Sequence, residues 1–265
     1  MEMFSIASSS SGNCICVGTK EYHVLIDVGI TGKKIEEGLN KYGLSGSDIK
    51  AILITHEHGD HIKSLGVMSR KYHLPIYTTR GTWSGAMECK SLGKIDTSLF
   101  HEVHYDETFK VGPLTINPIK VSHDTNEPVA YVVSGDERRV AVITDLGKYD
   151  DYIVDNLQDL DAILLEANYD YNMLQVGRYE PWLKRRVNGD TGHLSNEMSG
   201  QLLCRIAGDR LKTVLLGHMS KENNVPELAY EAVRCEVKLS DTPYEPEDFK
   251  IICAPRYEAS EKVVV

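Results

Sequence analysis

The sequence lacks any run of apolar residues that approaches the roughly 20 needed to cross a bilayer. Residues 1–5 also lack the basic segment, followed by a long apolar stretch, that marks a protein for secretion. We therefore expect a cytoplasmic protein with no membrane partner.

Paired cysteine spacings are missing as well. The six cysteines are scattered, without the spacing of a zinc knuckle or the density of a disulfide scaffold, at positions 14, 16, 89, 204, 235 and 253. They indicate reduced thiols. Cys14 and Cys16 point to one face of an expected strand, so a metal-binding pair is an alternative, but packed thiols are the more usual outcome. We leave both out of the predicted site.

No low-complexity tract, proline-rich linker or internal repeat divides the chain. Short apolar runs rich in β-branched residues predict buried strands at 22–26, 51–54, 130–133, 140–143, 162–165, 213–216 and 250–253. Helical patterns cover 31–42, 62–72, 150–156, 196–207 and 226–237. Because residues 1–26 and 97–145 look all-β, two sheets covered by helices fit better than a plain βαβ alternation. We predict one α/β domain over 1–265, an αββα four-layer sandwich.

Basic residues are fewer than acidic ones, 29 against 39. The formal net charge of −10 argues weakly against a nucleic-acid partner, because polyanion binders usually carry a positive surface. A net charge is an average over the molecule, however. Bound divalent ions or a local basic segment would reverse the field at the site itself.

The strongest motif is a cluster of imidazoles and carboxylates directly after the expected strand 51–54. His56, His58, Asp60 and His61 fall within six residues. Imidazole nitrogen and carboxylate oxygen suit zinc and similar ions, and a tight turn after a rigid strand aims alternate side chains at two adjacent metals. Gly59 is expected to permit this turn.

This cluster resembles the central His-x-His-x-Asp-His motif of the metallo-β-lactamase superfamily, and the resemblance extends over nearly the whole chain. It implies that Asp27 holds the ligand loops by hydrogen bonds without itself binding a metal. It implies two further ligands in His123 and Asp145. Each of these three residues closes an apolar or β-rich run, and each alone would more often be a turn-former or packed residue.

The last ligand has two candidates, His193 and His218. His218 follows the expected strand 213–216 after one glycine, so we assign it as the ligand. His193 lies in a loop just before a helix capped by Ser195. It resembles the proton-handling histidine of phosphodiesterases in this superfamily, which a glutamate orients, and Glu166 matches that glutamate.

The resemblance therefore implies two divalent ions, zinc or manganese with iron as a further option, held by seven ligands. His56, His58 and His123 would hold one ion, Asp60, His61 and His218 the other, with Asp145 between them. Asp60, His193 and Glu166 form the expected catalytic group.

Two segments suggest contact with a phosphodiester substrate. Residues 178–186 carry a net charge of +3 in an acidic protein and include Arg178, Lys184, Arg185 and Arg186, beside Tyr179 and Trp182. A solvated helix end explains this segment nearly as well. The serine-rich loop 7–13 offers Ser10, Ser11 and Asn13 to a phosphate, although a plain turn is the default there.

With these loops, the chain looks like the YycJ (WalJ) branch of the superfamily. That resemblance implies a 5′-to-3′ DNA exonuclease with a role in DNA mismatch repair and DNA as its partner. Only 47 residues separate Asp145 from His193, too few for the inserted β-CASP domain of related nucleases. Two alternatives remain: a phosphodiesterase for small cyclic or sugar phosphates, and a regulatory protein whose metal centre only stabilises the fold. The oligomeric state is not predicted.

Overall fold

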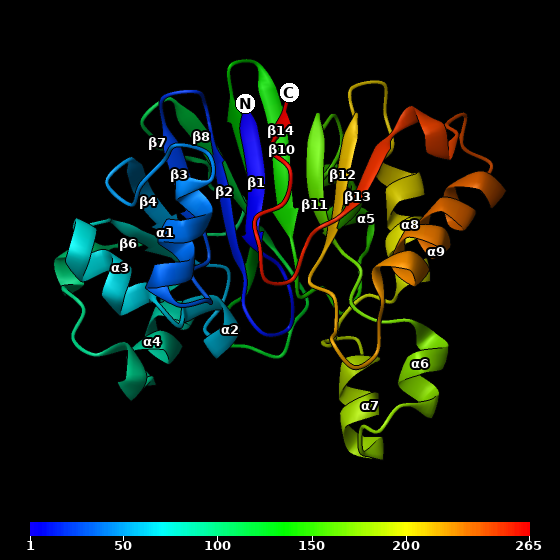
Figure 1. The fold of residues 1–265 in the computed structure, drawn as a ribbon, viewed down its shortest axis with the longest axis horizontal. Helices are drawn as coiled ribbons and strands as arrows, with labels where there is room; N and C mark the ends of the chain where they lie inside the picture. Colours follow the sequence, from blue (N-terminus) through cyan, green and yellow to red (C-terminus); the bar gives the residue numbers. More distant parts are fainter.

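The computed structural model describes all residues from 1 to 265 and contains two seven-stranded sheets packed face to face (Figure 1). The first sheet has the order β14-β1-β2-β3-β4-β5-β6. Its strands are β1 (Glu2–Ala7), β2 (Cys14–Gly18), β3 (His23–Ile26), β4 (Ile49–Leu53), β5 (Ile76–Thr78), β6 (Phe100–Glu102) and β14 (Val263–Val264). Strands β3 to β6 run parallel.

The second sheet has the order β13-β12-β11-β10-β9-β8-β7. Its strands are β7 (Phe109–Val111), β8 (Leu114–Lys120), β9 (Val129–Gly135), β10 (Arg138–Ile143), β11 (Ala162–Glu166), β12 (Thr213–Gly217) and β13 (Lys250–Cys253). Strands β10 to β13 run parallel, whereas β7 to β10 form antiparallel pairs.

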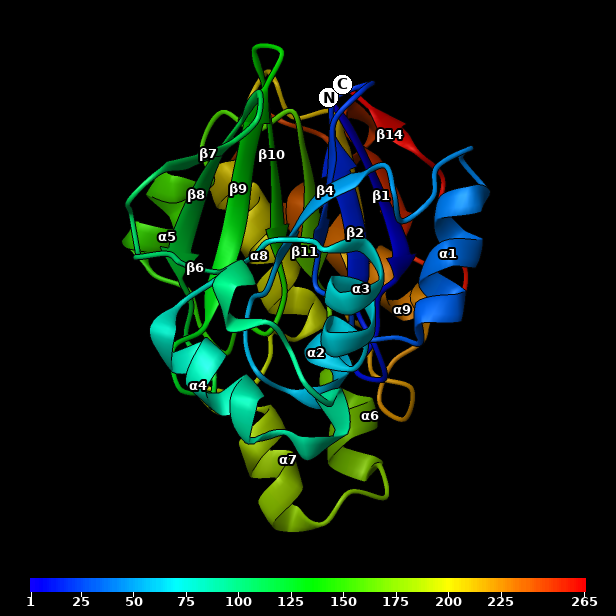
Figure 2. The same ribbon diagram turned by 90° about the vertical axis from the view of Figure 1, so that its left-hand side faces the viewer.

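Helices cover the outer face of each sheet. The first sheet carries α1 (Gly32–Asn40), α2 (Gly59–Ile62), α3 (Leu65–Tyr72) and α4 (Arg80–Glu88). Against the second sheet lie α5 (Asp151–Asn156), α8 (Asn196–Ile206) and α9 (Pro226–Leu239). The helices α6 (Tyr171–Val176) and α7 (Pro181–Val187) project away from the sandwich (Figures 1 and 2). The predicted αββα architecture is confirmed.

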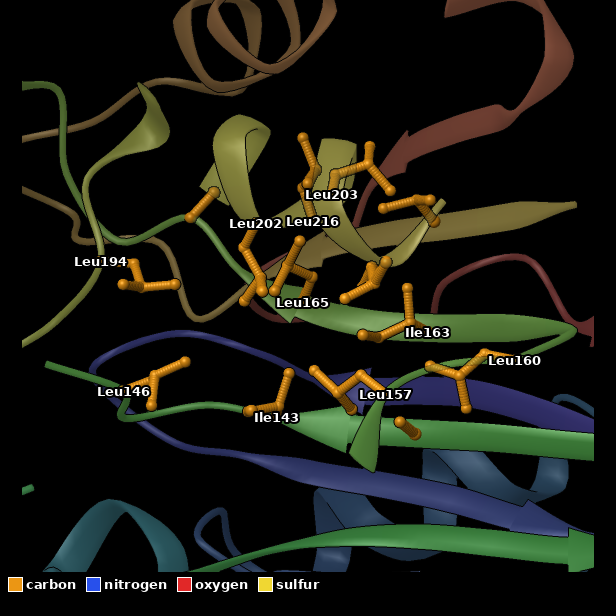
Figure 3. Close-up of a cluster of buried hydrophobic side chains, with 14 of the residues drawn as sticks. Ile143, Leu146, Leu157, Leu160, Ile163, Leu165, Leu194, Leu202, Leu203 and Leu216 are labelled. Carbon is orange, nitrogen blue, oxygen red and sulfur yellow. The ribbon is translucent and has the colours of Figure 1, made fainter. Parts of the chain in front are cut away.

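Successive side chains of a strand point to opposite faces of its sheet, and this explains why three large apolar cores form: one between the sheets and one between each sheet and its helices. In β2, Ile15 and Val17 enter the core between the sheets, while Cys14 and Cys16 pack towards the helices of the first sheet. In β11, Ile163 and Leu165 face α8 in the third core (Figure 3). Both cysteines are buried free thiols, as the sequence suggested.

The sequence-based prediction of helices was wrong at 62–72 and missed α4, α6 and α7. The expected helix 62–72 is interrupted, because Ser64 donates its backbone N–H to Val28 O and its hydroxyl to Ile30 O, between α2 and α3. Helix α4 was missed because Gly81 and Gly85 weaken its helical pattern, although Thr79 caps it. No helix is long and apolar enough to span a bilayer.

Tyr131 connects the two sheets beside the histidine cluster. It lies fully buried in β9, and its hydroxyl donates to the carbonyl of Ile54, two residues before His56, at 2.9 Å. This bond fixes the end of the first sheet's β4 from the second sheet. The ends of the strands from the two sheets are therefore held in register where the histidine loop begins.

Candidate metal centre

Five loops bring the predicted ligands to one edge of the sandwich. Because the carboxyl ends of parallel strands meet at one edge of a sheet, residues that follow them are brought close together. Asp27 follows β3, and the histidine cluster follows β4. The remaining loops follow β8, β10 and β12, and carry His123, Asp145 and His218.

The first group of side chains consists of His56, His58 and His123, whose ligand atoms lie within 4.8 Å of one another. His123 Nε2 lies 3.3 Å from His58 Nδ1. The other ring nitrogen of His123, Nδ1, donates to Gly192 O at 3.0 Å and so sets the tautomer that leaves Nε2 facing the group.

The second group consists of Asp60, His61 and His218, which meet the same distance limit. Asp145 lies between the two groups. One of its oxygens, Oδ1, is 3.5 Å from both His123 Nε2 and His218 Nε2, and Oδ2 is 3.2 Å from His61 Nε2. The structure thus brings together all seven side chains named as ligands from the sequence.

Asp27 holds the histidine loop by hydrogen bonds to Thr55 and His61. Its carboxylate accepts hydrogen bonds from the backbone N–H and the hydroxyl of Thr55, both at 2.9 Å, and lies 2.7 Å from His61 Nδ1. Thr55 Oγ1 in turn lies 3.0 Å from His56 Nδ1. Asp27 and Thr55 therefore fix which nitrogens of His61 and His56 point into the centre.

Glu166, at the end of β11, binds two histidines. Its Oε1 lies 2.8 Å from Nδ1 of His193 and 2.8 Å from Nδ1 of His218, and Oε2 accepts the backbone N–H groups of Leu146 and Leu194. Burial alone would raise the pKa of Glu166, but the charges and hydrogen bonds of the His193 and His218 rings lower it to about 2. Glu166 is ionised throughout the physiological range.

The donor set fits a cationic metal. His56 Nε2, Asp145 Oδ2 and His218 Nε2 are buried without any hydrogen-bond partner, although buried polar atoms are nearly always paired. Burial would raise the pKa of Asp145, but the surrounding imidazoles hold it well below its usual range, so it is a carboxylate. Imidazole and carboxylate ligands with free donor atoms are what divalent transition metals require.

Comparison with known proteins agrees with this geometry. The model of a family described as the beta-lactamase superfamily domain matches residues 23–219. Exodeoxyribonuclease WalJ of Streptococcus pneumoniae is 40% identical over 225 residues, which cover 85% of this chain and 84% of that protein. Exodeoxyribonuclease YycJ of Bacillus anthracis is 39% identical over 229 residues, covering 86% of each chain. The chain belongs to the metallo-β-lactamase superfamily, in the WalJ/YycJ branch.

A solved structure supports the fold assignment. Zinc-bound PqqB from Methylobacterium extorquens superposes with a TM-score of 0.74, covering 100% of both chains at 15% sequence identity. At that identity the likeness shows the fold alone. The fold and the cluster together imply divalent metal ions in this superfamily member.

The loop 7–13 of this metallo-β-lactamase fold divides into an exposed part and a buried part. Ser10 and Ser11 are exposed, and Asn168 Nδ2 donates to Ser10 Oγ at 3.2 Å. Asn13 is fully buried; its amide bonds the backbone of Ser9 and lies 3.0 Å from His61 Nε2. Asn13 therefore shapes the loop around the metal centre and is not free to contact a substrate from solution.

The basic segment 178–186 forms the loop after α6 and most of α7. Arg186 makes a two-fold ion pair with Asp124, the residue after the ligand His123. Lys184 donates to the carbonyl of Gln175. The side chains of Arg178 and Arg185 are exposed and make no ion pair, so they are the free cations of this segment.

Some residues that support the site carry no recognisable signal in the sequence. Thr55 immediately precedes His56, but nothing in its type or spacing marks it as a partner of Asp27. Asn168 donates to the backbone carbonyl of His218 at 2.7 Å and lies two residues beyond Glu166. The sequence also did not indicate that Glu166 would hold the ligand His218 as well as His193.

The glycine that the histidine loop requires is Gly29 rather than Gly59. A Cβ atom on Gly59 would meet nothing within 4 Å, whereas one on Gly29 would lie 1.5 Å from the backbone oxygen of Asp60. The expectation that Gly59 permits the turn was wrong, because the close approach is made by the loop after β3.

We predict that Gly29→Ala displaces the backbone of Asp60 and His61, since no flexible side chain can absorb the overlap. The purified variant should bind less than half the metal of the wild type and unfold at a lower temperature. Gly59→Ala is the matched control and should retain both properties. Equal metal content in the two variants, measured by elemental analysis, would show that the Gly29 contact is unimportant.

Proposed function

We propose that this chain is a metal-dependent exonuclease that removes nucleotides from the 5′ ends of DNA, with two zinc or manganese ions. The observation that carries the proposal is His193, held by the buried carboxylate of Glu166 beside the ligand cluster. Its side chain is 13% exposed, so it faces both the metal centre and the solvent from which a substrate arrives. The names of the WalJ and YycJ relatives support DNA as the substrate.

One ion would be held by His56, His58 and His123, the other by Asp60, His61 and His218, with Asp145 shared. Bound there, divalent ions supply Lewis-acid chemistry: they lower the pKa of water and neutralise charge on a phosphodiester. Seven ligands for two ions leave coordination positions open, which supports an enzyme over a purely structural site.

His193 is the proposed general acid. Because Nδ1 is engaged by Glu166, the ring presents Nε2 to the substrate and can donate a proton to the departing sugar oxygen. Glu166 stays ionised and orients the ring. Since the same oxygen of Glu166 binds His218, the general acid and a metal ligand are positioned by one carboxylate.

The projecting helices α6 and α7 are the proposed contact with the DNA backbone. The loop after α7 contains His193, whose backbone N–H donates to Val187 O at 2.9 Å. The side chain of Trp182 is 60% exposed on α7, where it is available to stack on a base. Arg178 and Arg185 supply positive charge that can contact DNA phosphates.

We also propose that residues 1–265 act as one catalytic domain without a β-CASP insertion. The segment between Asp145 and His193 forms only α5, β11, α6 and α7. At the far edge of the sandwich, β1 pairs with β14, and the amino group of Met1 donates to Val265 O at 2.9 Å.

His193→Ala should reduce DNA hydrolysis by about 10²–10⁴-fold, the usual contribution of a positioned general acid. Metal content should not change. Hydrolysis of bis(p-nitrophenyl) phosphate should fall far less, because p-nitrophenolate departs without a proton. His101→Ala, an exposed histidine on β6, is the control. Unchanged DNA turnover with excess Mn²⁺ would contradict the role of His193.

Arg178→Ala combined with Arg185→Ala should weaken DNA cleavage steeply and lower the slope of log affinity against log salt by about 2. Hydrolysis of the small chromogenic diester should stay the same. Arg234→Ala with Lys238→Ala removes two charges on α9 as a control. Equal effects on both substrates would favour a small cyclic or sugar phosphate as the natural substrate.

A further inference from the structure

A cavity of about 620 Å³ opens directly beside the metal ligand His123. It is lined by residues of the β6–β7 loop, of the end of β8 and the loop that follows it, and of the start of α5. It lies outside the basic helices, and His123 is the one metal ligand in its lining. Its walls carry two tyrosines and two lysines, namely Tyr105, Lys120, Lys148 and Tyr152.

The walls of this cavity are held in place by hydrogen bonds. The hydroxyl of Tyr152 accepts the backbone N–H of Lys120 at 3.0 Å and donates to Asp106 Oδ1 at 2.7 Å. The backbone N–H of Asp106 donates to Pro118 O at 2.9 Å. The α5 side, the β8 end and the β6–β7 loop are thus fixed to one another, so a ligand would enter a site that is already formed.

The composition of the cavity suits a nucleotide. Val121, Pro128 and Ile153 supply an apolar surface, and the half-buried rings of Tyr105 and Tyr152 supply aromatic faces. Aromatic side chains bind bases of any sequence by stacking. Asn126 adds an amide that can donate to or accept from a base edge.

The charges around the cavity leave the lysines available. Lys120 is exposed, and its ammonium lies 5.7 Å above the ring of Tyr105. Lys148 pairs with Asp190, but both side chains are more than half exposed, and such surface pairs contribute little. Of the two acidic residues in the lining, Asp106 accepts from Tyr152, and Asp150 accepts the backbone N–H of Ile153.

We propose that this cavity is the subsite for the terminal nucleotide of the DNA strand. Tyr105 and Tyr152 stack on its base, and Lys120 and Lys148 bind its phosphate. The inference rests on the proposed exonuclease function and names how that enzyme would engage a strand end. The cavity has the size of small-molecule pockets, about 300–1,000 Å³, so it admits one nucleotide and no duplex. Its contact with His123 places that nucleotide next to the bond that is cut.

The test compares two ligands by calorimetry on the metal-loaded protein: deoxythymidine monophosphate and inorganic phosphate. Inorganic phosphate can reach the metals and the lysines but has no base to stack, so the ratio of the two affinities isolates the tyrosine surface of the cavity. The wild type should bind the nucleotide at least 10-fold more tightly than phosphate. Tyr105→Leu should bring that ratio close to one, and Lys120→Ala with Lys148→Ala should weaken nucleotide binding several-fold. Lys238→Ala with Tyr257→Leu is the matched control and should change neither.

A ratio of one in the wild type, or nucleotide binding that neither cavity variant changes, would overturn the subsite. The lysine variant changes exposed side chains only, so misfolding does not obscure its result. DNA cleavage measured in parallel separates the two proposals. If the cavity variants cleave DNA with the KM of the wild type, the subsite is rejected and the exonuclease proposal stands. If the protein binds the nucleotide but cleaves no DNA, the exonuclease proposal is rejected and the nucleotide site stands.

Discussion

Buried carboxylates paired with imidazoles hold this site together. Asp27, Asp145 and Glu166 are all removed from solvent, and a buried charge is strongly destabilising unless partners surround it. Each of these carboxylates meets the ring of at least one histidine from another loop. The loops of both sheets therefore have to converge for the charges to be satisfied, and a bound cation completes the compensation.

Backbone strain at the same positions indicates that the arrangement is fixed in advance. Asp27, Asp145 and His218 have φ angles of 59°, 58° and 52°, in the left-handed region that side chains other than glycine rarely adopt. Such conformations cost of order 1–3 kcal/mol each and cluster at functional sites. All three directly follow or nearly follow a buried strand, so the rigid sheets can enforce them. The fold thus stabilises ligand directions that isolated loops would not keep.

Local sequence patterns predicted those features of the fold and the site that depend on residues close together in the chain. The strands predicted from β-branched runs are present. The dense cluster from His56 to His61 correctly predicted where the candidate metal centre lies. The patterns did not predict features that depend on contacts between distant parts of the chain. The clash that makes Gly29 necessary involves Asp60, and the burial of Asn13 depends on its packing beside His61. The short helices α4, α6 and α7 carry weak local patterns, and the cavity beside His123 is assembled from three separate segments.

The central claim is that imidazoles and carboxylates from both sheets enclose a pair of cations. Anomalous X-ray diffraction from crystals grown with zinc, recorded on both sides of its absorption edge, tests this claim most directly. The account predicts two peaks, one bounded by His56, His58 and His123 and one by Asp60, His61 and His218, with Asp145 contacting both. A map without an ion at these residues, or with one ion whose coordination positions are all filled by protein, would contradict it.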